Sequence, residues 1–208
     1  MSQIFSFRTR EVRWFINKPV LEVPGWFEKL PSTAFTRESR EDIYLVLPDR
    51  TDLGVKFRED RLELKYRLGD PQSGVIAPGI SGSFETWEKL GFQSTREVSS
   101  AEFPDIGKAL RLPVKKWRWA TKIEQTDTGV KYHPVGREVQ HSVQLEYTEL
   151  QVFGSDWYSI GLEWPDMPEI SLPVRLLSGI LTSTVFDLKS SMGYPEFLQK
   201  MLRQEGSA

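Results

Sequence analysis

The chain has 208 residues, of which 39% are hydrophobic and 27% charged, as is typical of globular proteins. This length suits one domain that buries about 70% of its unfolded surface, and we expect residues 1–208 to form a single domain. The formal net charge of −2 excludes an overall cationic field that would gather nucleic acid or anionic lipid, so any anion site must be local. The absence of cysteine excludes disulfides, thiolate chemistry and cysteine-ligated metals.

The sequence carries no sign of membrane insertion or export. Its first residues lack the apolar stretch of a secretory signal, and no run approaches the roughly 20 apolar residues of a membrane span. We therefore expect a soluble, cytoplasmic protein without a membrane partner.

The first third of the chain alternates between apolar and polar residues, the period typical of strands. Thr9–Ile16 and Asp42–Leu47 are predicted strands, and Pro24–Leu30 is a predicted helical turn because it opens on proline and ends before another. The segment Asp52–Leu68 follows and predicts a β-hairpin.

The two faces of this hairpin differ in chemistry. With a turn centred on Glu59-Asp60, one face is apolar and pairs Phe57 with Leu62, Val55 with Leu64 and Leu53 with Tyr66. The other face pairs Arg58 with Arg61, Lys56 with Glu63, Gly54 with Lys65 and Asp52 with Arg67. Such a cationic face suits a polyanion and its metal, or it is a solvated outer face.

The middle of the chain predicts a loop, two strands and a connection. Asp70–Gly82 is rich in proline and glycine and predicts a loop, and Ser83–Leu90 alternates like a strand. Ser99–Leu110 predicts a short helix or an irregular connection. Val114–Ile123 predicts a strand with Lys116, Arg118 and Lys122 on one face.

The last third predicts two strands and then two helices. Glu138–Leu150 and Asp156–Trp164 alternate, with Glu146 and Glu163 on their polar faces, whereas Leu172–Val185 and Pro195–Leu202 have helical spacing. Seven or eight strands thus precede two helices, which indicates an α+β fold of mainly antiparallel β-structure. A recurring polar face fits an open sheet with one solvated face or a closed barrel with a polar lumen. We favour closure, because a barrel abolishes exposed strand edges.

Four motifs, taken in order, resemble those of the CYTH superfamily, the triphosphate tunnel metalloenzymes. They are Asp42-Ile43-Tyr44-Leu45, Leu53–Arg58 followed by Leu62–Lys65, Val114–Arg118 and Gly161–Trp164. The resemblance covers most of residues 9–200. It implies an eight-stranded tunnel barrel with peripheral and C-terminal helices, whose lumen holds a triphosphate with a divalent metal and hydrolyses triphosphates or cyclises ATP.

The first strand departs from this resemblance. The family motif E-x-E-x-K appears as Glu11-Val12-Arg13-Trp14-Phe15, so Arg13 stands in place of a carboxylate. This loss of a carboxylate favours a protein that binds the anion over an enzyme that hydrolyses it.

The resemblance and the strand faces together give the expected site. The set expected to bind phosphate is Arg13, Lys56, Arg58, Lys65, Arg67, Lys116 and Arg118. Glu11, Glu63 and Glu163 are the expected ligands of Mg²⁺ or Mn²⁺, with Glu63 and Glu163 also catalytic. The alternative is that these carboxylates, with Glu146, are salt-bridge partners of the cations.

Other constellations are weaker. Trp117 and Trp119 alternate with cations as in a nucleic-acid platform, but strand parity turns them away, and we expect them to pack under the C-terminal helices. His133 and His141 have no third histidine or cysteine with which to complete a transition-metal site.

Three functions follow from the sequence. The first is a metal-dependent triphosphatase, the second a catalytically inactive anion-binding barrel, and the third a scaffold with a partner surface on its C-terminal helices. The expected ligand is a small phosphorylated anion rather than nucleic acid, and the protein is expected to be a monomer or homodimer.

Overall fold

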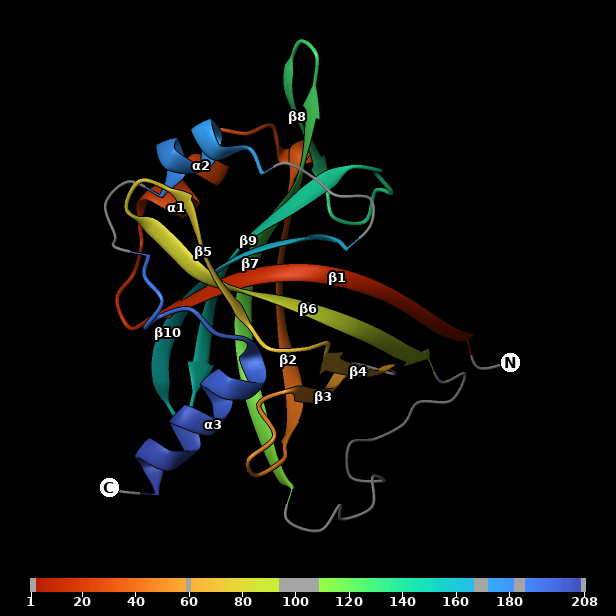
Figure 1. The fold of residues 1–208 in the computed structure, drawn as a ribbon, viewed down its shortest axis with the longest axis vertical. Coiled ribbons are helices and arrows are strands. Elements are labelled where there is room, and N and C mark those ends of the chain that lie inside the picture. Colours follow the sequence, from red (N-terminus) through yellow and green to blue (C-terminus); the bar gives the residue numbers. More distant parts are fainter. Residues whose placement is uncertain (1–2, 59–60, 94–108, 167–171, 182–185, 207–208) are drawn as a thin grey trace.

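The computed structural model describes residues 3–58, 61–93, 109–166, 172–181 and 186–206, which form ten strands and three α-helices (Figure 1). The strands are β1 (Gln3–Ile16), β2 (Thr36–Val46), β3 (Leu53–Arg58), β4 (Arg61–Arg67), β5 (Gln72–Ala77), β6 (Ile80–Gln93), β7 (Leu110–Thr126), β8 (Gly129–Pro134), β9 (Ser142–Val152) and β10 (Ser155–Pro165). The helices are α1 (Glu22–Phe27), α2 (Val174–Ile180) and α3 (Tyr194–Glu205), with a 3-10 turn, η1, at Ser32–Ala34. None of the helices in these ranges is long and apolar enough to cross a membrane.

Eight strands close into an antiparallel barrel in the order β1-β10-β9-β7-β2-β3-β4-β6, and β6 pairs back with β1. Strand β1 completes the ring because it is long enough to pair with both neighbours: Gln3–Val12 pairs with β6, and Thr9–Ile16 pairs with β10. β5 extends from β6, and β8 extends from β7. The prediction of a closed α+β barrel is confirmed, and the open-sheet alternative is wrong.

The larger hydrophobic cluster lies outside the barrel wall. The outward-facing side chains of β1, β10, β9 and β7, among them Trp14, Leu162, Tyr147 and Trp119, pack against α1, α2 and β5. Figure 1 shows α1, α2 and β5 gathered on one side of the barrel. Because strand side chains alternate between faces, this burial leaves the opposite, inward face free to be polar.

A second cluster closes one end of the barrel. Inward-facing Phe15, Val114 and Leu150 pack against Phe197 and other apolar residues of α3. The Phe15 ring stacks on the Phe197 ring with a centroid distance of 3.9 Å. α3 therefore seals this end of the lumen with apolar side chains.

The structure corrects several predicted boundaries. Asp70–Gly82 is not a loop, because it contains β5 and the start of β6. Gly74 serves packing, since a Cβ there would lie 2.6 Å from the Phe84 ring, whereas Gly79, at a φ of 76°, makes the turn between β5 and β6. β2 begins six residues before its predicted start, β8 escaped prediction, and Glu138–His141 precedes β9 rather than belonging to it.

The two C-terminal helices are confirmed with altered lengths as α2 and α3. The predicted turn residues Glu59-Asp60, most of the connection predicted at Ser99–Leu110, and Val185 lie outside the described residues.

Candidate anion-binding site in the barrel lumen

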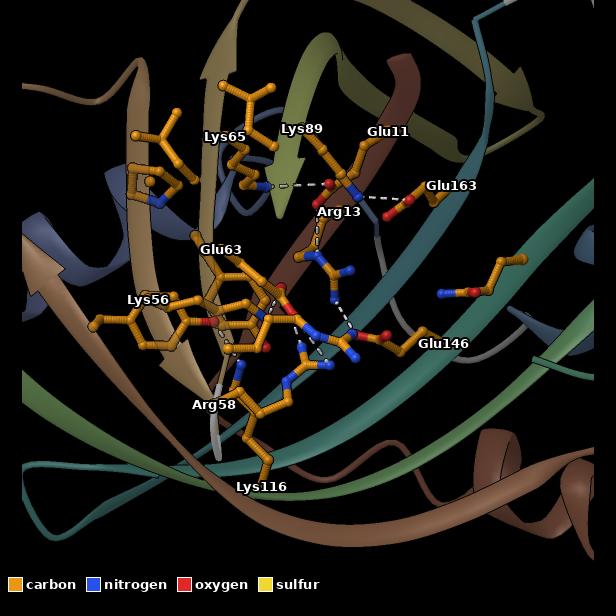
Figure 2. A pocket seen from close by; sticks show the side chains of 18 of the residues that line it. Glu11, Arg13, Lys56, Arg58, Glu63, Lys65, Lys89, Lys116, Glu146 and Glu163 are labelled. Atoms are coloured by element: carbon orange, nitrogen blue, oxygen red, sulfur yellow. Dashed lines mark hydrogen bonds and ion pairs between the residues drawn. The ribbon is translucent and has the colours of Figure 1, made fainter. Parts of the chain in front are cut away.

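The barrel encloses a cavity of about 320 Å³ whose lining is dominated by cations (Figure 2). Nine cationic side chains line it: Arg13, Arg40, Lys56, Arg58, Arg61, Lys65, Lys89, Lys116 and Arg118. Four carboxylates line it as well: Glu11, Glu63, Glu146 and Glu163. Positive charge therefore exceeds negative charge in a cavity where the low dielectric strengthens electrostatic interactions.

The predicted hairpin supplies one wall of this cavity in the expected register. Lys56 lies opposite Glu63, and Gly54 lies opposite Lys65. Its polar face points into the lumen: the Lys56 side chain is 18% exposed and its Nζ lies 3.0 Å from Glu63 Oε2. The alternative of a solvated outer face is wrong for these residues.

Asp42 is the shared carboxylate partner, or hub, of four cationic side chains at this wall. Its side chain is fully buried, and it accepts from Lys116 Nζ at 2.9 Å and from Arg58 Nε at 3.2 Å. Lys56 Nζ lies 3.4 Å away, and Arg40 Nε lies 3.2 Å away. Burial alone would raise the pKa of Asp42, but these cations outweigh it and hold the pKa well below its usual range. Asp42 thus stays ionised and fixes four cationic side chains at one place.

Two of the lysines around Asp42 bind their protons weakly. Burial lowers the pKa of Lys56 to about 7 and that of Lys116 to about 8, although Asp42 opposes the shift in both cases. Lys116 Nζ also donates to the Tyr44 hydroxyl at 2.7 Å and lies 4.1 Å from the centre of the Tyr194 ring. An added anion would favour the charged form of both amines.

Arg13 lies at the centre of the lumen. Its Nε donates to Glu11 Oε1 at 2.8 Å, and its Nη1 donates to Glu146 Oε1 at 2.8 Å and to the Ser159 hydroxyl at 3.2 Å. Gly161 lies opposite Arg13 on β10, and a Cβ there would stand 2.6 Å from the guanidinium carbon. The missing side chain at residue 161 is what admits the guanidinium.

Glu146 and Glu11 each have a further cationic partner. Arg118 Nε donates to Glu146 Oε2 at 2.5 Å, and Lys65 Nζ donates to Glu11 Oε2 at 3.3 Å. Burial would raise the pKa of Glu11, but Lys65, Arg13 and Lys89 together lower it. Both carboxylates are therefore ionised and already neutralised.

Only two of the three predicted metal ligands lie together. Glu11 and Glu163 lie opposite each other on β1 and β10, but Glu63 lies on β4 beside Lys56 and Arg58 (Figure 2). Glu163 accepts from Lys89 Nζ at 2.6 Å. Within the described ranges, no three histidine, cysteine, aspartate or glutamate side chains are grouped so as to hold a metal ion. Each of these three carboxylates already pairs with a cation of the lumen, which leaves them poorly suited to hold Mg²⁺ or Mn²⁺ by themselves. Their assignment as metal ligands, and the catalytic roles of Glu63 and Glu163, stay predictions.

One predicted phosphate ligand is not part of the cavity lining. Arg67 is on β4, but its Nη1 lies 2.8 Å from Glu85 Oε1 and its guanidinium carbon lies 5.8 Å from the centre of the buried Trp87 ring. The cavity lining does not include Arg67. The other six predicted phosphate ligands all line the cavity.

The tryptophans of β7 have different surroundings. Trp119 is buried in the outer apolar cluster, which also contains Leu177 of α2, in line with the prediction. The prediction is wrong for Trp117, which is 42% exposed. His133 Nε2 lies 2.8 Å from Glu124 Oε2, a structural pairing on the barrel exterior.

Sequence reasoning missed Asp42, Arg40, Arg61 and Lys89 as members of the site, although it placed Arg61 on the polar face of the hairpin. Asp42 was recognised only as part of a motif, although a charged residue beside Ile43 and Leu45 is itself a signal of a polar inner face. Arg40 precedes it by two residues and so shares its face, but β2 was predicted to start at Asp42. Lys89 was on a predicted strand whose polar face was not assigned to the lumen.

Comparison with known proteins finds no matching family model and no matching curated protein. Eight solved chains are similar in structure. The mimivirus capping enzyme triphosphatase has a TM-score of 0.48 at 11% identity, over 84% of this chain and 86% of that chain. A second similar structure is the RNA triphosphatase domain of a trifunctional mimivirus mRNA capping enzyme. Its TM-score is 0.40 at 12% identity, over 86% of this chain and 88% of that chain.

The S. pombe RNA triphosphatase Pct1, in complex with the Spt5 CTD, gives a TM-score of 0.36 at 7% identity, over 87% of this chain and 80% of that chain. These likenesses are too distant to say anything about the lumen residues.

Proposed function

We propose that the barrel lumen binds a small, highly phosphorylated anion such as a triphosphate. The observation that carries the proposal is the convergence of nine cationic side chains on one cavity that has only four carboxylates in its lining. Converging guanidinium and ammonium groups suit phosphate oxygens, since Arg binds them through two parallel hydrogen bonds and Lys as a point charge. The resemblance of four sequence motifs to triphosphate tunnel enzymes agrees with this ligand class.

The phosphate groups are proposed to lie between the Asp42 hub and Arg13. In this arrangement Lys56, Arg58, Lys116 and Arg118 bind from the walls of β3 and β7, and Lys65 binds from β4. Because α3 seals one end, the anion enters from the other end, where Phe7 lines the cavity and is 46% exposed. Arg67 is left out of the proposed contacts, since it pairs with Glu85 and is not part of the cavity lining.

Two neighbouring lysines on β7 provide a matched test. Lys116 lines the cavity, whereas Lys115 is exposed on the opposite face of the same strand. Losing a buried, charge-assisted contact costs about 2 kcal/mol or more, so Lys116→Ala should weaken tripolyphosphate binding by about thirtyfold. Lys115→Ala should bind like the wild type.

Isothermal titration calorimetry measures both variants, and phosphate release assayed in the same samples, with and without Mg²⁺, tests for hydrolysis. Binding without release supports the anion-binding function over the triphosphatase. Equal losses in the two variants, or no binding by the wild type, would contradict a lumen site and leave the scaffold.

A further inference from the structure

The guanidinium of Arg13 occupies a position that resembles a cation site. It lies between carboxylates from two strands, with 2.8 Å from Nε to Glu11 Oε1 and 2.8 Å from Nη1 to Glu146 Oε1 (Figure 2). All three side chains are at least 89% buried. A buried pair of carboxylates needs a cation between them, and here the chain itself supplies it.

The surroundings of Arg13 are shaped for this side chain. Gly161 leaves the space that the guanidinium occupies, and the Ser159 hydroxyl accepts from Nη1 at 3.2 Å. The Tyr194 ring covers the guanidinium at 5.1 Å from its carbon to the ring centre. Residues of β10 and α3 thus fix the cation that β1 provides.

A divalent ion would have little to bind in this place. Mg²⁺ takes one or two carboxylates together with phosphate oxygens, but each carboxylate here already has two cationic partners. Glu11 has Arg13 and Lys65, and Glu146 has Arg13 and Arg118. A further double charge would be placed directly among these three cations.

Arg13 retains one amino group for a ligand. Its hydrogen bonds to the described residues use Nε and Nη1, which leaves the Nη2 amino group for another acceptor, and the side chain lines the cavity. A guanidinium that is fixed by two carboxylates and still has N–H groups to donate is a preorganised phosphate donor.

We propose that Arg13 takes the place of a divalent cation, so that the lumen binds phosphorylated anions without metal. This inference rests on the proposed anion-binding function and adds which groups neutralise the charge of the bound anion. The bound anion is neutralised by Arg13 and the lysines and arginines of the walls. Free Mg²⁺ then acts only on the ligand in solution, whose negative charge it reduces.

The test compares tripolyphosphate binding by the wild type in two buffers, one freed of divalent ions by a chelating resin and one with excess Mg²⁺. A resin replaces EDTA because EDTA is itself a polyanion that would compete for a cationic lumen. The dissociation constant without Mg²⁺ should be equal to or lower than the constant with Mg²⁺. Binding that is about tenfold or more tighter with Mg²⁺ would overturn the metal-free mode and leave the proposed function standing. No binding in either buffer would overturn the proposed function itself.

Two variants at residue 13 sharpen the test. Arg13→Glu adds a third carboxylate beside Glu11 and Glu146, and should lose metal-free binding by about thirtyfold or more but recover it with Mg²⁺. Arg13→Gln should lose binding to a similar extent without recovery. Recovery by both variants, or full binding by Arg13→Gln without metal, would contradict the assigned role. If the Glu variant does not fold, the wild-type comparison and the Gln variant still show whether binding depends on Arg13 or on a metal.

Discussion

Lys56 and Lys116 differ from surface lysines in how weakly they hold a proton. Burial lowers the pKa of Lys56 to about 7 and that of Lys116 to about 8. Both amines lie within hydrogen-bonding distance of Asp42, which favours their charged forms but does not restore the ordinary value. The charge of the lumen therefore changes within the physiological pH range.

This shift predicts a pH-dependent affinity. Binding an anion raises the pKa of Lys56, so affinity is highest below the pKa of the free protein and falls as pH rises through it. One amine contributes a decline of about tenfold between roughly pH 6 and 8. Lys56→Arg should remove this decline, because a guanidinium stays protonated throughout.

Calorimetric titrations of the wild type and Lys56→Arg with tripolyphosphate, run at the same pH values, check this prediction. Ionisation of the ligand cancels in the ratio of the two affinities. Parallel pH profiles would show that Lys56 keeps its proton, or that it does not contact the ligand.

At the scale of elements, the pairing of β1 with β10 decides where Arg13 can lie. Gly161 lies opposite Arg13 in the register of these strands. A methyl group at residue 161 would approach the guanidinium carbon to 2.6 Å, so the guanidinium must move although the backbone need not.

Gly161→Ala is therefore expected to fold but to bind tripolyphosphate about tenfold or more weakly, because a shift of the guanidinium disrupts preorganised charge-assisted contacts. Gly25→Ala in α1 is the matched control, since a Cβ there would meet no atom within 4 Å. Calorimetric binding together with circular dichroism separates the two effects. Full affinity in Gly161→Ala would contradict the placement of Arg13 in the ligand site.

The sequence predicts elements well where side chains alternate cleanly. The hairpin of β3 and β4 has the predicted register, because one polar and one apolar face leave a single register that satisfies both. β5 escaped prediction because Gly74 and its neighbours resemble a loop, whereas in the fold the glycine makes room for the Phe84 ring. A packing reason of this kind depends on a partner strand and is not visible locally.

The sequence predicts most cationic residues of the site but not the carboxylates with which they pair. Period-two alternation placed Lys56, Arg58, Lys116 and Arg118 on strand faces that do meet in the lumen. The partners of these residues come from strands far apart in the chain: Arg118 meets Glu146, and Lys116 meets Asp42. Such contacts follow only once the barrel order is known.

At the scale of the whole molecule, the barrel reverses the usual positions of core and surface. The larger apolar cluster covers the outer wall beneath α1 and α2, and the inside of the ring holds the charges. Closure depends on the pairing of β1 with β6, which joins residues 3–12 to residues 84–93. The ring thereby brings cations from six strands around one cavity, with α3 sealing one end.

If the cavity receives the anion, a bound anion should be visible there in a crystal. Crystals soaked with tungstate, an electron-dense tetrahedral oxyanion that stands in for phosphate, should show an anomalous peak in the lumen. The peak is expected within hydrogen-bonding distance of Arg58, Lys116 and Arg13. A peak only on the outer surface of the barrel, or a lumen without tungstate at concentrations that saturate binding in solution, would contradict it.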